Sequence, residues 1–251
     1  LQREDLPALD QYLQNLPSSE TVRAVFRLTS NEQEKLLTLL PPESAADLID
    51  DVPDSQAAEL LDNLRPEEAA SIVNEMDSDE AADVLAEMDR EDVEEILSLM
   101  DADEAAEARQ LIAYDPETAG GLMMKEYLSY PETNTVGDAV ADIAVRGEDY
   151  PIYYLQHVFV VGPLGRLQGV AGLTDIAGAK PQARLQELAT PVDAVNAKAG
   201  LDQLEDFFES RDTPIAPVVD DAGRLLGAIR RRAVFDAITE RADESYLKSQ
   251  G

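Results

Sequence analysis

The 251-residue sequence contains no cysteine and only one histidine, His157. Without cysteine the chain forms neither disulfide bonds nor a thiolate metal site, which agrees with a reducing compartment. His157 lies in an apolar, strand-like stretch, where a histidine is more often packed than used as a general base. The sequence also has no phosphate-binding loop motif, so we expect no enzyme activity.

Basic residues are scarce as well: the chain has 20 Lys and Arg but 52 Asp and Glu, which gives a net charge of −32. The excess is concentrated, because residues 1–122 carry −25 of it. Such a surface repels nucleic acid and anionic membranes and attracts cations. No run of about 18 apolar residues occurs, so we expect no segment of this sequence to span a membrane.

The sequence does contain a repeat of 12 residues. One apolar residue marks its register, at Leu40, Val52, Leu64, Met76, Met88, Met100 and Ile112. Five positions later comes a small or β-branched residue, at Ala45, Ala57, Ala69, Ala81, Val93 and Ala105. Twelve residues form a tight turn and a helix of roughly nine residues. A helix this short is unstable alone in water, so each copy must pack on its neighbours in a solenoid.

Helix start signals recur at one place in the repeat. Pro41, Pro42, Pro53 and Pro66 stand where a first helical residue belongs. Acidic residues follow in the first turn, where they complement the helix dipole. Residues 1–39 are less regular and are expected to form two or three helices that cap the stack. The first half of the chain is therefore predicted to be all-α.

The pattern changes after Ala113. Pro116 cannot lie inside a helix, and Gly120-Gly121 is expected to free the backbone at a domain junction. Strand-like and helix-like pieces then alternate in two units that share the motif Gly-Arg-Leu-x-Gly, at 165–169 and 223–227. Each unit is predicted to run helix, strand, turn, strand, helix, with strand-like pieces of the first unit at 152–154 and 158–161.

Two units with this motif resemble a tandem CBS (Bateman) module. The acidic repeat, the motif Tyr-Asp-Pro-Glu-Thr-Ala-Gly-Gly-Leu-Met at 114–123 and the CBS-like pair together resemble, over nearly the whole chain, the cytosolic region of the MgtE family of magnesium channels and transporters. The resemblance implies a multidomain α and α/β protein. It implies an N-terminal right-handed α-superhelix over residues 1–122, CBS domain 1 over 123–184, CBS domain 2 over 185–242, and the start of a connecting helix over 243–251.

The resemblance also implies a mechanism, in which Mg²⁺ bridges the acidic superhelix and the CBS domains and thereby closes a pore. The physics is coherent, because a hard cation relieves repulsion between facing carboxylates and shifts the population toward the state that binds it. A homodimer through the CBS domains, a transmembrane domain in the same polypeptide and a place at the cytoplasmic side of the bacterial inner membrane are implied as well. Carried over residue by residue, the implied Mg²⁺ ligands are Asp47, Asp79, Asp83, Gly121 through its carbonyl, Asp202, Asp212, Asp236 and Glu244.

The sequence departs from the family pattern in the second CBS unit. An acidic residue expected at position 233 is replaced by Ala233, after three arginines at 230–232, and Arg241 and Gly200 replace two further acids. At least one Mg²⁺ site is therefore expected to be missing. We hypothesise that Arg230, Arg231 or Arg232 reaches carboxylates of the superhelix and partly replaces an ion.

Nucleotide binding is expected to be weak or absent. CBS units that bind adenosine ligands usually hold the ribose through a Ser/Thr-x-x-Asp pattern. The first unit has Gly172-Leu173-Thr174-Asp175, which lacks the first hydroxyl, and the second has residues 230–233, which lack both groups. Two alternatives remain: a soluble helical-repeat and CBS scaffold that binds a partner protein, and a nucleotide-sensing module without a transport role.

Overall fold

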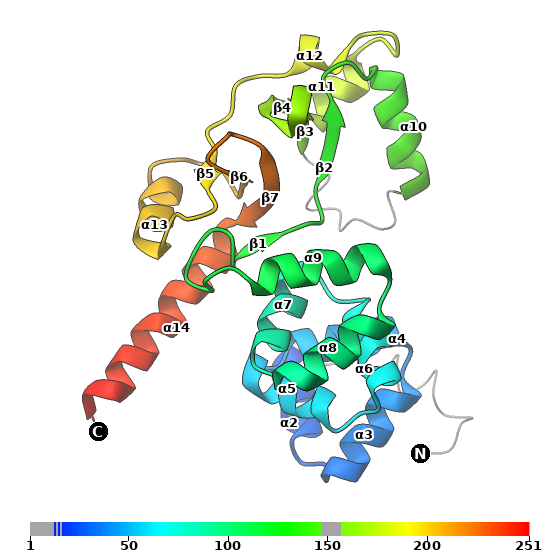
Figure 1. Cartoon of the computed structure of the whole chain (residues 1–251), viewed down its shortest axis with the longest axis vertical. Helices are drawn as coiled ribbons and strands as arrows, with labels where there is room; N and C mark the ends of the chain where they lie inside the picture. Colours follow the sequence, from blue (N-terminus) through cyan, green and yellow to red (C-terminus); the bar gives the residue numbers. More distant parts are fainter. Residues whose placement is uncertain (1–12, 14, 16, 147–156, 251) are drawn as a thin grey trace. The chain divides into compact units, whose positions relative to one another are not determined.

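The computed structural model describes residues 13, 15, 17–146 and 157–250, without the side chains of residues 18, 146 and 243–250. The chain divides into two compact units, a helical unit (Leu1–Ala113) and an α/β unit (Tyr114–Gly251) (Figure 1). The expected strand-like piece at 152–154 lies outside the described residues. Among the described residues, no helix combines the length and apolarity needed to cross a membrane.

The helical unit is the predicted solenoid of short helices. Each helix packs on the second one along the chain, α4 on α6, α5 on α7, α6 on α8 and α7 on α9. Ala45 and Ala57 are fully buried, so the alanine column lets neighbouring helices approach closely. The helices are α2 (Ser18–Val25), α3 (Ser30–Leu39), α4 (Pro42–Asp50), α5 (Asp54–Asp62), α6 (Pro66–Val73), α7 (Ser78–Ala86), α8 (Arg90–Leu99) and α9 (Ala102–Ile112).

Prolines mark two of these helix starts as expected. Pro42 and Pro66 are the first residues of α4 and α6. The prediction for Pro41 and Pro53 is wrong by one residue, because both are N-cap residues with φ of −56° and extended ψ. Asp54 takes the first helical position of α5 instead, where its charge complements the helix dipole.

The α/β unit contains two sheets and therefore two lobes. The first lobe has β2 parallel to β3 and β3 antiparallel to β4. The second lobe repeats this with β5, β6 and β7 and adds β1 antiparallel to β7. The first lobe comprises β2 (Leu128–Pro131), α10 (Val136–Arg146), β3 (His157–Val161), η2 (Pro163–Gly165), β4 (Leu167–Gly172), α11 (Leu173–Gly178) and α12 (Leu185–Leu188). The second comprises β1 (Met123–Met124), β5 (Val195–Asn196), α13 (Leu201–Glu209), β6 (Ile215–Val219), β7 (Leu225–Arg230) and α14 (Arg231–Gln250).

The duplication read from the sequence is confirmed in the strand register. Val160 lies opposite Gly169 in the first lobe, and Val218 lies opposite Gly227 in the second, with an irregularity at the next residue in both. The lobes pack through a small apolar core of Met124, Phe159 and Ala228. Their turns also meet, since the Leu167 N–H donates to the Gly223 carbonyl at 3.0 Å.

The junction at 114–124 is built into the second lobe. The N–H groups of Ala119 and Gly120 donate to the carbonyls of Ala199 and Ala197, both at 2.8 Å. A Cβ on Gly120 would clash with the Tyr114 ring, and one on Gly121 would clash with backbone atoms of residues 115 and 116. The expectation that these glycines free the backbone is therefore wrong: they permit close packing.

Candidate cation-binding surface

Five carboxyl groups interact where the end of α4 approaches the start of α7. Asp50 is the last residue of α4. Loss of solvent contact, followed by repulsion from Glu80, Asp77, Asp47 and Asp79, raises the pKa of Asp50 from 3.8 to about 8. A carboxyl group in such surroundings loses its proton less readily than usual, and a cation that compensates its charge favours the ionised form. This cluster is therefore a place where a cation binds favourably.

Two of the expected ligands lie in this cluster. Asp47 and Asp79 both repel Asp50, so the structure brings them into one neighbourhood. Asp79 is only 4% exposed, although its side chain is acidic. Asp83 lies one helical turn further along α7 and is half-buried.

The sequence did not single out Asp50, Asp77 and Glu80 as site residues, although the 12-residue repeat contains a signal for them. Asp50 and Glu80 are 30 residues apart, and so are Asp62 and Asp92. Partial loss of solvent contact, and then Asp92, Asp89 and Glu59, raise the pKa of Asp62. In a solenoid with a constant repeat, a contact between one helix end and the third helix along recurs at a constant spacing.

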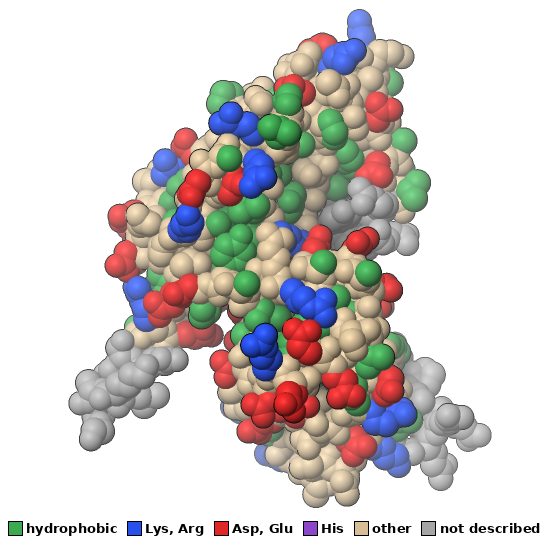
Figure 2. Space-filling view, in the orientation of Figure 1, with side chains coloured by type: hydrophobic (Ala, Val, Ile, Leu, Met, Phe, Trp, Pro, Cys, Tyr) green, Lys and Arg blue, Asp and Glu red, His purple; other side chains and the backbone are tan. Residues whose placement is uncertain are grey.

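A related contact joins the turn after α6 and the start of α9. Loss of solvent contact, and then Asp101, Glu75 and Glu107, raise the pKa of Glu104 in the first turn of α9. Asp50 and Asp62 are moreover the last residues of their helices, where the helix dipole disfavours negative charge. The helical unit thus carries successive crowded carboxylates. Asp and Glu side chains gather over it on the face that Figure 2 shows.

The donor chemistry fits Mg²⁺, while the geometry does not form a closed cage. Within residues 17–146 and 157–250, no three acidic or histidine side chains converge closely enough to hold a metal ion. Carboxylate oxygens are hard donors, and Mg²⁺ is commonly bound by one or two carboxylates while it keeps several water molecules. Crowded carboxylate pairs are compatible with that mode of binding.

Two of the expected ligands of the second lobe, Asp202 and Asp236, have basic partners. Oδ1 of Asp202 lies 2.7 Å from Nη2 of Arg241, and Oδ2 of Asp236 lies 3.2 Å from Nε of Arg232. Asp212 is exposed in the loop before β6, and its role stays a prediction. The side chain of Glu244 lies outside the described ones. Gly121 is buried, and its carbonyl as a ligand also stays a prediction.

Arg231 is engaged inside its own lobe. Its guanidinium donates to the carbonyls of Phe208, Arg211 and Thr213 and lies 5.8 Å from the Phe208 ring centroid. The hypothesis that Arg231 reaches carboxylates of the superhelix is therefore wrong, because its donors hold α13 and the following loop against the start of α14. Arg232 is exposed and paired with Asp236.

Comparisons with known proteins match both units. Residues 13–117 match the family model of the MgtE intracellular N domain, and residues 186–240 match that of the CBS domain. Relatives named magnesium transporter MgtE include those of Thermus thermophilus and Bacillus subtilis, which are 32% and 27% identical over 139 residues. Each alignment covers 55% of this chain and 30% of the relative. The chain thus matches less than a third of the length of these proteins.

Solved structures match nearly the whole chain. The cytosolic domain of the Mg²⁺ channel MgtE in complex with ATP is 29% identical, with a TM-score of 0.81 and coverage of 93% of this chain and 95% of that one. The soluble part of a magnesium transporter is 25% identical, with a TM-score of 0.82 and coverage of 95% and 94%. The chain is therefore a helical-repeat domain joined to a CBS pair. It belongs to the MgtE family and corresponds to the cytosolic domain of its magnesium transporters.

Proposed function

We propose that this chain is the Mg²⁺-sensing regulatory region of a magnesium transporter or channel, and that Mg²⁺ bridging the helical unit and the CBS pair closes the pore. The observation that carries the proposal is the carboxylate cluster around Asp50, in which Asp47 and Asp79 take part. Without a cation, these groups repel one another. A ligand that binds one arrangement of the chain better than another shifts the population toward it.

The chain's own residues divide the work in this proposal. Asp47, Asp79 and Asp83 on α4 and α7 supply acceptor oxygens, and Asp50 adds to their field. In the second lobe, Arg241 and Arg232 already compensate Asp202 and Asp236. Both pairs are exposed, and such pairs contribute little to stability. Mg²⁺ can therefore compete for these carboxylates, although less favourably than for carboxylates without a basic neighbour.

A Mg²⁺ titration of this chain, followed by small-angle scattering and limited proteolysis, tests the proposal. We expect compaction and protection as Mg²⁺ rises through the millimolar range, and a loss of this response in the double variant Asp47→Asn, Asp79→Asn. The matched control is Asp51→Asn, Glu91→Gln, which removes the same charge from exposed positions of the same unit. An unchanged scattering curve across millimolar Mg²⁺ would refute sensing by this chain.

We further propose that the CBS pair forms a homodimer and that the polypeptide also contains a transmembrane domain, with this region at the cytoplasmic side of the bacterial inner membrane. The support is the likeness to proteins named magnesium transporters, of which the matched region is 30%. Sedimentation of the chain with and without Mg²⁺ tests the dimer. A monomer at all concentrations and in both conditions would contradict it.

Nucleotide binding by this chain is proposed to be weak, although a similar cytosolic domain has been solved with ATP. Asp175 is the third residue of α11, while its counterpart in the second lobe, at the same place in α14, is Ala233. The second lobe therefore lacks the carboxylate that would hold a ribose. Calorimetric titration with ATP tests this, and saturation in the micromolar range would overturn it.

A further inference from the structure

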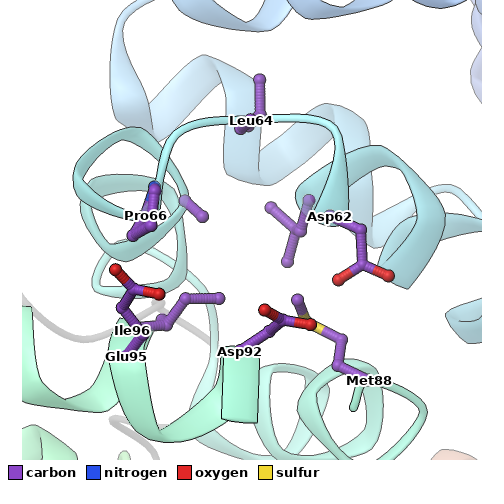
Figure 3. A pocket seen from close by; sticks show the side chains of 9 residues that line it. Asp62, Leu64, Pro66, Met88, Asp92, Glu95 and Ile96 are labelled. Atoms are coloured by element: carbon purple, nitrogen blue, oxygen red, sulfur yellow. The ribbon is translucent and has the colours of Figure 1, made fainter.

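A pocket in the helical unit lies one repeat along from the Asp50 cluster. It has a volume of about 40 Å³ and is formed by α5, α6 and the turn between them, and by α8 and the turn before it (Figure 3). A buried water requires roughly 10–15 Å³ on the same measure, so the pocket has room for roughly three water-sized groups. The lining residues are Leu61, Asp62, Leu64, Pro66, Ala69, Met88, Asp92, Glu95 and Ile96.

The pocket is apolar inside and acidic at its rim. Its apolar side chains belong to the core of the unit, and they are at most 9% exposed apart from the half-buried Pro66. Asp62, Asp92 and Glu95 are exposed, and Figure 3 shows their carboxylates bordering the space that Met88 and Ile96 also face. A ligand that suits both surfaces has an aliphatic part and a positive charge at its end.

The charge around the pocket strengthens this requirement. Asp89 and Glu59 do not line the pocket, but they act on Asp62 together with Asp92, so their charge adds to that of the rim. The nearest basic residue on the connecting turn, Arg65, is paired with Glu68 at 2.6 Å. A cation at this rim would relieve the repulsion between the carboxylates. The apolar surface beside it would strengthen the binding of a cation that carries methylene groups, but not of a bare ion.

We propose that this pocket binds the end of a small aliphatic amine, such as a diamine or polyamine, with its ammonium group at the acidic rim and its methylene groups against Met88, Leu64 and Ile96. A divalent metal ion fits less well, because it keeps several water molecules and gains nothing from apolar walls. The proposal is independent of Mg²⁺ sensing, since it concerns other residues and another class of ligand.

The first test varies the ligand and leaves the protein unchanged. Calorimetric or NMR titration of the full chain compares ammonium, n-butylammonium, 1,4-diaminobutane and 1,4-butanediol at constant ionic strength. Each methylene group that the pocket fully buries should tighten binding by about fourfold. We therefore expect n-butylammonium to bind at least about tenfold more tightly than ammonium, and butanediol not to bind. Equal affinities for ammonium and n-butylammonium would overturn the proposal, since they would indicate simple charge attraction.

The second test varies the rim. The double variant Asp62→Asn, Asp92→Asn should weaken binding of 1,4-diaminobutane by about tenfold or more, because charge-assisted contacts are the stronger ones. The matched control is Asp51→Asn, Glu91→Gln, which removes the same charge at comparable places, a helix C-terminus and the first turn of α8. Equal loss in both double variants would overturn the proposal. The proposal would also be overturned if 1,4-diaminobutane changed chemical shifts only at residues outside α5 and α8.

Discussion

Replacing Asp50 by asparagine should stabilise the helical unit at neutral and alkaline pH. Asp50 has a pKa of 3.8 in ordinary surroundings and about 8 in the folded chain. The folded state therefore holds the proton more tightly than the unfolded state does. The stability that this proton contributes is fully present below about pH 4 and is lost as pH rises through about 8. Asparagine cannot ionise, so the variant keeps that stability over the whole range.

The size of the effect follows from linkage. A rise from 3.8 to about 8 corresponds to about 5–6 kcal/mol, because each pKa unit is worth about 1.36 kcal/mol. Asp50 as a residue is nevertheless exposed, so solvent screens much of the repulsion that its carboxylate meets. We therefore expect the variant to gain roughly 1–2 kcal/mol near pH 8.5 and almost nothing near pH 4.

Chemical unfolding of the full chain at several pH values measures this gain, and hydrogen exchange in peptides that cover α4 and α7 localises it. The control is Asp51→Asn, since Asp51 is exposed, adjoins Asp50 and shares the unfavourable end of the α4 dipole. Saturating Mg²⁺ should reduce the difference between the parent chain and the Asp50 variant. A gain that is the same at all pH values, or that Asp51→Asn reproduces, would refute the reasoning.

Three further perturbations test other parts of the structure. Gly121→Ala should destabilise the α/β unit by about 1–3 kcal/mol in urea unfolding, because its Cβ would clash with backbone atoms. Gly178→Ala, where a Cβ meets nothing within 4 Å, should be neutral, and equal effects would contradict the packing role of Gly121. Arg231→Met should cost about 2–3 kcal/mol in the same assay, because three carbonyls lose a charged donor; an unchanged unfolding midpoint would show that water replaces it. Arg241→Ala should change stability little, but it should increase Mg²⁺-induced NMR shifts around Asp202, and identical shifts would mean that the ion pair does not compete with Mg²⁺.

Much of the helical unit was predictable because a constant period constrains a solenoid strongly. A 12-residue helix and turn must bury the same positions in every copy, and Ala45 and Ala57 are indeed fully buried. The approach of Asp50 to Glu80 was not predicted. The repeat predicts which face of a helix is buried, but it does not predict which later helix contacts the end of that helix. Once the packing is known, the 30-residue spacing follows for both Asp50 and Asp62.

The junction and the arginines show where sequence reasoning was insufficient. A pair of glycines indicates either a flexible backbone or a backbone packed closely against other atoms. Here the ring of Tyr114 and the neighbouring backbone show that the packing is close. Likewise, a run of arginines in an acidic chain suggests that the arginines compensate nearby carboxylates. Arg231 is instead used to bind three carbonyls, and such acceptors have no sequence signature because every residue carries one.

Strand β1 has a consequence for how this chain can be divided or recombined. It precedes the first lobe in the sequence but completes the sheet of the second, as the partner of β7. Excision of the first lobe with everything before it would leave β7 with an unpaired edge, and such edges promote association between chains. The two lobes are therefore interlocked along the polypeptide. A functional exchange of modules between relatives must move residues 114–250 together, or it must supply a new edge strand.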